Sequence, residues 1–456
     1  MDVMNAPARQ RQSQDRRRSA WWRPEARLLV ILAAFALLAA CGSTAGGEAA
    51  DATDAGGADG DQVEITLWAG RDYFIPEDNF AKFHEEHPNI RVNADVVSLD
   101  EVFQDLGRMR DAGQPLPDIV HTDGQIKAAM WEAGFVRDIS DVVARWEEED
   151  PEGYGMIYDS VWADGTWDDK QIAMADTGTM DMLFYRKDWF EEAGYDQEFE
   201  SWDEFLEALR TIKAERPDVV PFSVPAARRE GQDAVFMQMS AMGVEFENGI
   251  PQLQSESGLY FIEFYQTLSR EGLVSPDAIA WTQEDARGAF QGNRAAAASD
   301  GWGQIDELAT AGLEYGEQVI GSAFPTSLHG GTEDGQIVGF AKNWFITAES
   351  EHPYEASLVF RYLMDPEIVV AQAINGQIAR HEAVLAEDSE LFEAVPAMSD
   401  FVDEISNAEE FSTDTNYPQV TEALERMLQD MLQNPDEAPE ALAERWQAEF
   451  DALAPS

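Results

Sequence analysis

The hydrophobic and polar positions after residue 62 follow two periods in turn. Residues 63–67 alternate between apolar and polar side chains, a pattern that predicts a strand with one buried face. Residues 78–86 instead place Phe80 and Phe83 on one face of a helix, which ends at Pro88. A strand followed closely by an amphipathic helix is the repeating unit of α/β folds.

The same succession continues down the chain. Residues 90–92 predict a second strand, residues 99–109 a second helix and residues 117–120 a third strand. Strands that alternate with helices form a parallel sheet whose faces the helices cover. The pattern therefore predicts an α/β fold.

Helical patterns also occur later in the chain. The segment Ser201-Trp202-Asp203-Glu204 is a capping box that opens a helix. Residues 258–269, residues 354–364 and the segment from Tyr417 carry apolar side chains at helical spacing. The 456 residues are enough for two domains of about 150–200 residues each.

The first 40 residues have the composition of an export signal. Seven arginines precede an uncharged apolar run over residues 28–40, and this run is shorter than the roughly 20 residues that span a bilayer. We therefore expect a signal peptide over residues 1–40. The ending Leu38-Ala39-Ala40-Cys41-Gly42 resembles the lipobox of bacterial lipoproteins, which implies a lipid on Cys41 and an anchor on the outer face of the cell membrane. An ordinary signal peptide with a chance cysteine is the alternative.

Residues 41–62 are rich in Gly, Ala and Asp and have no apolar periodicity, which predicts a flexible linker. Cys41 is the only cysteine, so we expect no internal disulfide.

The charge of the chain is strongly negative. It contains 88 acidic and 31 basic residues, for a formal net charge of −57. This composition argues against nucleic-acid binding, which needs a basic surface. Adaptation to high salt and a general gain in solubility both explain the acidity. The lysines are Lys82, Lys127, Lys170, Lys187, Lys213 and Lys342.

Motifs of metal and hydrolase chemistry are absent from the sequence. His84 and His87 do not form an H-E-x-x-H motif, and we expect them to be solvent-facing helix residues rather than metal ligands. No G-x-S-x-G elbow occurs. We therefore expect no metal and no cofactor.

A series of segments, in one order along the chain, carries a family resemblance. They are residues 65–68, 87–92, 117–120, 182–194, 201–205, 290–296 and 301–302. Together they resemble the extracellular solute-binding proteins of ABC importers, the family that contains maltose-binding protein.

This resemblance implies two α/β lobes, each a sheet flanked by helices, joined by several crossings of the chain. A solute would bind in the cleft between the lobes, and a hinge motion would close the cleft over it. We expect the N-terminal lobe at 63–173 and 297–338, the C-terminal lobe at 174–296 and 339–456, and crossings near 172–177, 295–299 and 338–345.

A sugar site needs aromatic faces for stacking and fixed polar groups for hydrogen bonds, and α/β clefts form at the carboxyl ends of strands. Trp68 ends the first strand, with Asp72 and Tyr73 just beyond it; Asp123 follows the third strand; Asp176 lies on the first crossing. Each has an alternative role: Trp68 in the core, Asp123 as a helix cap, and Asp176 as a hydrogen-bond partner within the hinge.

Four further candidates lie later in the chain. Trp302, flanked by glycines, suits a turn that exposes its ring for stacking, and Asp300 lies beside it. Trp344 lies on the last crossing and could instead pack under the hinge. Arg380 could bind a hydroxyl or a carboxylate, with a surface ion pair as the alternative.

These features predict a monomeric, lipid-anchored binding protein that delivers a solute to the permease subunits of an ABC importer. An exported carbohydrate hydrolase with paired carboxylates and a ligand-sensing surface lipoprotein are the alternatives. Aromatic richness favours a sugar or an oligosaccharide as the solute. A polyol phosphate, an amino-sugar and a zwitterionic osmolyte stay open.

Overall fold

The computed structural model describes residues 62–70, 74–76, 78–98, 101–228, 231–301, 304–374, 380–386, 388–395, 398, 401–402, 409–410, 414 and 416–454. These residues belong to one compact unit that extends from Asp59 to Ser456. The expected signal peptide, Cys41 and nearly all of the expected linker lie outside the described residues. In the described part of the chain, no helix is both long and apolar enough to span a membrane.

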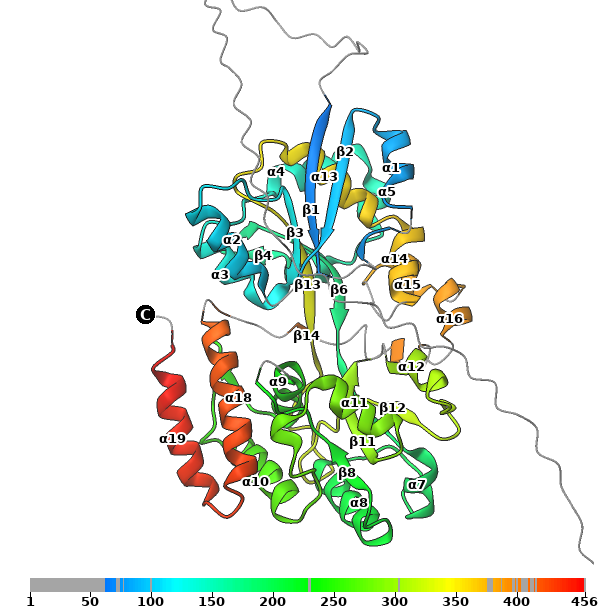
Figure 1. Cartoon of the computed structure of the whole chain (residues 1–456), viewed down its shortest axis with the longest axis vertical. Helices are drawn as coiled ribbons and strands as arrows, with labels where there is room; N and C mark the ends of the chain where they lie inside the picture. The colour runs from blue at the N-terminus through cyan, green and yellow to red at the C-terminus, as the bar shows by residue number, and fades with distance from the viewer. Residues whose placement is uncertain are drawn as a thin grey trace, which may run out of the picture. The chain divides into compact units, whose positions relative to one another are not determined.

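The first sheet is built around β1 (Val63–Ala69). This strand pairs in parallel with β2 (Ile90–Val96) on one side and with β3 (Ile119–Asp123) on the other. Helices α1 (Ala81–Glu86) and α2 (Val102–Asp111) connect these strands (Figure 1). The predicted β-α-β-α-β unit is confirmed.

A second sheet contains, among the described residues, four strands in the order β12 (Ile320–Ser322), β7 (Asp181–Tyr185), β11 (Ala295–Gly301) and β8 (Val220–Ser223). β11 is antiparallel to β7 and parallel to β8. Every residue of β7 is buried, as is typical of strands that are covered on both faces.

Two strands pass between the sheets. β6 (Met174–Thr179) and β13 (Val338–Ile346) pair antiparallel and lie side by side between the two sheets in Figure 1. The start of β13, at Val338, packs in the core of the second sheet, and its later residues pair with β3 in the first. The crossings expected near 172–177 and 338–345 are therefore found.

The crossing expected near 295–299 is wrong, and so is the assignment of residues 297–338 to the N-terminal lobe. β11 and β12 both lie in the second sheet with β7. The alanine run at the start of β11 allows close covering of a central strand, because its side chains are small and all buried.

The assignment of residues 339–456 to the C-terminal lobe holds only in part. β13 pairs with β3, and α13 (Pro353–Leu363) packs in the same core as β1. Helices α18 (Tyr417–Gln433) and α19 (Pro439–Asp451) do pack in the core of the second sheet.

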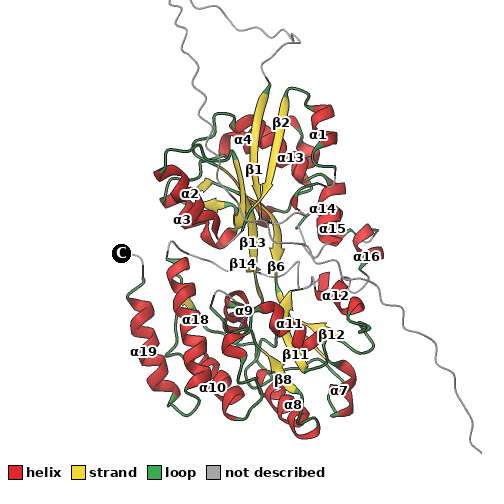
Figure 2. Ribbon diagram, in the orientation of Figure 1, coloured by secondary structure: helices red, strands yellow, loops and turns green. Residues whose placement is uncertain are grey.

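The remaining elements are helices around the two sheets, the edge strand β14 of the first sheet, and two small antiparallel pairs, β4 with β5 and β9 with β10 (Figure 2). They are η3 (Gly124–Ile126), α3 (Lys127–Glu132), α4 (Ser140–Glu149), α5 (Pro151–Gly155), α6 (Asp159–Asp164), β4 (Thr166–Trp167), β5 (Lys170–Gln171), α7 (Lys187–Glu192), α8 (Trp202–Glu215), α9 (Gln232–Ala241), β9 (Phe246–Glu247), β10 (Ile250–Pro251), α10 (Glu256–Arg270), η4 (Ala278–Ala280), α11 (Gln283–Gln291), α12 (Gln304–Thr310), α14 (Pro366–Ile374), α15 (Glu382–Leu385), α16 (Glu390–Ala394) and β14 (Glu409–Glu410).

The predicted cap of α8 is present with one change. The Ser201 hydroxyl accepts a hydrogen bond from the Glu204 amide at 3.2 Å, as a capping box requires. The Glu204 carboxylate accepts its bond from the amide of Glu200, at 2.8 Å, rather than from that of Ser201. The helix therefore begins where the sequence predicts.

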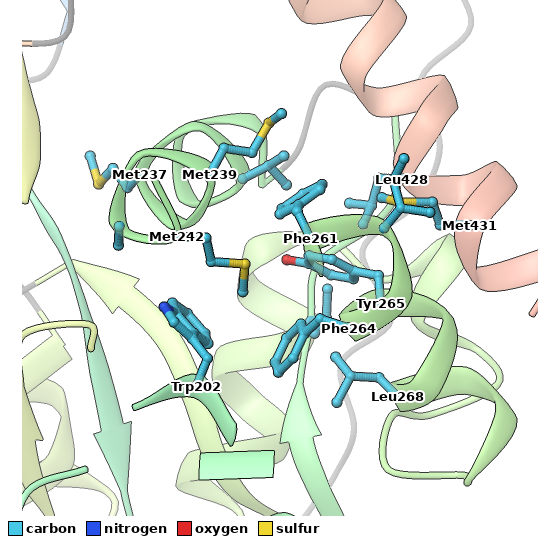
Figure 3. Close-up of a cluster of buried hydrophobic side chains, with 14 of the residues drawn as sticks. Trp202, Met237, Met239, Met242, Phe261, Phe264, Tyr265, Leu268, Leu428 and Met431 are labelled. Atoms are coloured by element: carbon cyan, nitrogen blue, oxygen red, sulfur yellow. The ribbon is translucent and has the colours of Figure 1, made fainter. Parts of the chain in front are cut away.

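The core of the second sheet is rich in aromatic rings and methionines. Figure 3 shows Trp202 at the start of α8, Met242 at the end of α9, Phe261 and Tyr265 on α10, and Met431 on α18 gathered in one cluster. Phe261 and Met242 have no exposed surface. This cluster fixes α8, α9, α10 and α18 to one another and to the sheet.

Truncation of Phe261 should leave a cavity in this cluster. Phe261→Ala is expected to lower the free energy of unfolding by about 3–5 kcal/mol, measured by chemical denaturation. Val96→Ala is the control, because Val96 is 53% exposed and should change stability by less than about 0.5 kcal/mol. Equal effects of the two substitutions would contradict the packing described here.

Candidate functional site

The carboxyl end of β3 and the crossing strands form a polar three-stranded ribbon. In the antiparallel pairing of β3 with β13, Lys342 lies opposite Asp123 and Trp344 opposite His121. Side chains alternate between the faces of a strand, so these four residues share one face of the sheet.

A bulge brings Asp176 to the same face. β13 pairs with β6 through Lys342 and Thr177 and then through Asn343 and Ala175, so Asp176 is the extra residue at the register shift. A β-bulge turns side chains away from the regular alternation. The Asp176 carboxylate consequently reaches across to β13 and β3.

The Asp176 carboxylate links all three strands. It accepts a hydrogen bond from the Trp344 indole N–H at 2.7 Å, and its other oxygen lies 3.3 Å from Nε2 of His121. His121 and Trp344 have no exposed surface, and Asp176 is 2% exposed. The Phe74 ring covers His121, with ring centroids 3.9 Å apart. The Asp176 carboxylate is therefore enclosed by residues of β3 and of the crossing strands, and Trp344 is buried beside it.

Asp123 lies in a different environment. Its carboxylate accepts a hydrogen bond from Nζ of Lys342 at 2.6 Å, and the two side chains keep 28% and 13% of their surface exposed. Although Asp123 precedes η3, its side chain makes no capping hydrogen bond. The helix-cap interpretation is therefore wrong, and Asp123 belongs to an accessible ion pair.

Trp68 lies on the other face of the first sheet. Trp68 pairs with Val120 on β3. The side chain of Val120 points to the face opposite that of His121 and Asp123, because side chains alternate along a strand, and the Trp68 side chain lies on that opposite face too. Its half-buried ring packs against the cluster around Phe135. The structure therefore does not bring Trp68 together with Asp123. Asp72, Tyr73 and Trp302 lie outside the described residues.

Asp300, at the end of β11, is enclosed by protein groups. Arg287 donates two hydrogen bonds to its carboxylate, both at 2.7 Å, and Gln283 donates a third at 3.1 Å. Burial raises the pKa of Asp300, while the bonds from Arg287 act in the opposite direction. With 1% of its surface exposed, Asp300 fixes α11 to β11.

Arg380 forms an ion pair with Asp164 at the end of α6. The backbone carbonyl of Asp164 also accepts a hydrogen bond from Nζ of Lys127 at 2.6 Å. The ion pair that the sequence offered as the alternative role of Arg380 is therefore present. It is mostly buried rather than on the surface, since Arg380 keeps 15% and Asp164 7% of its side chain exposed.

The histidines near β2 differ from expectation. Nε2 of His84 accepts a hydrogen bond from the amide of Val92 at 3.0 Å, and burial lowers the pKa of His84. His87 packs on the Phe83 ring. The solvent-facing prediction is therefore wrong for His84. Among the residues that the structure describes, no group of three His, Cys, Asp or Glu side chains could hold a metal ion.

Lys342 and His121 are polar residues of the ribbon that the sequence did not single out. A signal existed for Lys342, because it is a rare lysine in an acidic chain and interrupts the apolar segment from Val338 to Ile346. His121 directly precedes the Thr122-Asp123 end of β3.

Comparison with known proteins identifies the type of fold. A family model described as bacterial extracellular solute-binding protein matches residues 69–369. Curated relatives described as binding proteins in Brucella abortus (strain 2308) and Brucella suis biovar 1 (strain 1330) are each 26% identical over 212 residues, which is 46% of this chain and 50% of theirs. The chain thus spans about half the length of the curated relatives it matches.

Solved structures share the two-lobed architecture over most of the chain. The maltose-bound MalE3 of T. maritima has a TM-score of 0.71 at 22% identity, and covers 86% of this chain and 100% of its own. An ABC transporter solute-binding protein of Thermotoga lettingae, bound with α-D-tagatose, has a TM-score of 0.69 at 19% identity. The match covers 86% of this chain and 100% of that one. The sugar-binding protein MalE of Xanthomonas citri has a TM-score of 0.70 at 16% identity, and the match covers 86% of this chain and 97% of that one.

The Asp176 link should contribute strongly to stability. Trp344→Phe removes the indole donor from a buried carboxylate and is expected to cost about 1.5–3 kcal/mol in the free energy of unfolding.

Trp446→Phe is the matched control for Trp344→Phe. Trp446 also donates to a carboxylate at 2.7 Å, but Asp430 is bonded by Arg445 as well and keeps 21% of its side chain exposed. Water can replace the lost donor there, so the cost measured by chemical denaturation should be smaller. A larger cost for Trp446→Phe would refute this role of Asp176.

Proposed function

Because the chain belongs to the bacterial extracellular solute-binding proteins, we propose that it captures a sugar or an oligosaccharide and delivers it to an ABC importer. The family match over residues 69–369 is the observation that carries the proposal. The maltose and tagatose bound to two structural neighbours support a carbohydrate as the solute class.

The crossing strands support a hinged mode of capture. β6 and β13 form an antiparallel pair in the first sheet, and β13 begins in the core of the second; a few residues of such a crossing can absorb the backbone change of a hinge. A solute that contacts both lobes only when they are closed shifts the population toward the closed form. The importer would then recognise that form.

The enclosed carboxylates favour binding over hydrolysis. A glycosidase needs two carboxyl groups that reach the substrate. Asp176 and Asp300 are each about 1% exposed as side chains and bonded to protein donors, whereas Asp123 remains accessible.

Export and anchoring complete the proposal. The basic leader, the apolar run and Cys41 support processing at residue 41 and attachment of a lipid. A tether of about twenty residues would hold the binding domain near the permease and raise its effective concentration there.

A thermal-shift screen with maltose, maltotriose, chitobiose, D-tagatose and ribitol tests the function. At least one compound should raise the melting temperature, since a ligand at 100 times its Kd adds about 2.7 kcal/mol to stability. Chromatography of the same samples should recover the compound unchanged. A flat response to every compound would contradict carbohydrate binding, and released products would contradict a binding role.

Trp302 is expected to stack on the bound sugar, on the basis of its glycine-flanked position in the sequence. Trp302→Ala should abolish the thermal shift while leaving the melting temperature of the unliganded protein nearly unchanged. A large loss of unliganded stability would instead indicate a core residue.

A further inference from the structure

Lys342 occupies an unusual position for a cation in this protein. Of the six lysines, all of which the structure describes, Lys342 is the one on a strand that passes between the sheets. Its ammonium group meets Asp123 at 2.6 Å, at the carboxyl end of β3. Ligands of α/β proteins bind at such strand ends.

We propose that Lys342 and Asp123 together form a two-point contact for adjacent hydroxyl groups of a neutral sugar. The inference rests on the proposed function and adds Lys342 to the binding residues. In this contact Lys342 donates a hydrogen bond to one hydroxyl oxygen, and Asp123 accepts one from the neighbouring hydroxyl.

The backbone is built to bring the pair together. A Cβ on Gly124 would lie 2.8 Å from the carbonyl oxygen of Ala341 and 3.1 Å from Oδ1 of Asn343. Only a glycine therefore allows the chain after Asp123 to lie this close to β13.

Asn343, the residue after Lys342 on β13, carries a buried amide at this same close approach. Its side chain has no exposed surface, and within the described part of the chain neither Oδ1 nor Nδ2 has a hydrogen-bond partner. A buried unpaired amide costs stability and requires an explanation.

The exposure of Asp123 separates this pair from the ion pair of Arg380 with Asp164, whose carboxylate side chain is only 7% exposed. Lys127 also has a nearly buried side chain, but it bonds to the carbonyl of Asp164 and fixes α3 to α6. Lys342 and Asp123 both keep an accessible fraction, 13% and 28%. The Asp123 carboxylate can therefore exchange water for a solute hydroxyl, and the ammonium group of Lys342 lies directly beside it.

The pairing of charges selects a neutral solute. Lys342 alone would attract an anion, but Asp123 at 2.6 Å cancels its charge, and the chain carries a net charge of −57. A donor and an acceptor side by side match two neighbouring hydroxyls, each of which both donates and accepts. Charged partners also strengthen such hydrogen bonds.

Lys342→Met tests the proposal by isothermal titration calorimetry, with the compound from the five-sugar panel that gives the largest thermal shift. The variant keeps the length of the side chain and removes its donor. Affinity should fall about 10- to 100-fold, because a hydrogen bond to a charged group is lost. Lys82→Met is the matched control, since Lys82 forms an exposed pair with Glu367 at 2.9 Å, and its affinity should equal that of the wild type.

A monodeoxy series of the same sugar identifies a direct contact. One deoxy compound should bind the wild type more weakly but lose no further affinity in Lys342→Met, because the same bond is missing in both cases. Fully additive losses for every deoxy compound would mean that Lys342 acts only through the local structure, and would overturn the proposal. Lys342→Leu, which also lacks the donor, serves the same comparison if Lys342→Met does not fold.

The experiments distinguish a failure of this inference from a failure of the proposed function. If the wild type binds a sugar and Lys342→Met binds it equally well, this inference is wrong and the proposed function stands. If the wild type binds no compound of the panel, both are wrong.

Discussion

The buried carboxylate of Asp176 is the interaction on which the geometry of the crossing strands depends. A carboxylate with 2% exposure is tolerated only when hydrogen-bond donors surround it. Its partners, Trp344 and His121, come from two other strands, so β3, β13 and β6 cannot slide past one another without breaking these buried hydrogen bonds. The bulge at residue 176 gives the carboxylate its direction, and the register follows from it.

That register also determines the accessible pair at the sheet edge. In an antiparallel ladder, the pairing that sets Trp344 opposite His121 sets Lys342 opposite Asp123 two residues further along. A slip of β13 by one residue would turn Lys342 and Trp344 to the other face, away from Asp123 and His121. The structural link and the candidate solute contact are therefore parts of one register, the first buried and the second open to water.

Much of the first sheet could be predicted from the sequence, because β1, α1, β2, α2 and β3 have clear local periods. The residue types of the site were also predictable: Asp123 and Asp176 are carboxylates at strand ends or crossings. Their accessibility was not. Asp176 is covered by an indole 168 residues away in the chain, and Asp300 by an arginine 13 residues away. Such contacts depend on the tertiary fold, which no local pattern encodes.

The misassigned crossing at 295–299 has the same origin, since a buried alanine run fits a crossing and a central strand equally well until its partners are known. The corrected topology bears on where the proposed hinge could bend. With β11 held between β7 and β8, the described strands that pass between the sheets are β6 and β13, paired to each other. The Asp176 link holds one end of this pair inside the first sheet, and Val338 is packed in the second core. The proposed closing motion would therefore be absorbed between these two fixed points, in residues 177–180 of the first crossing and 339–343 of the second.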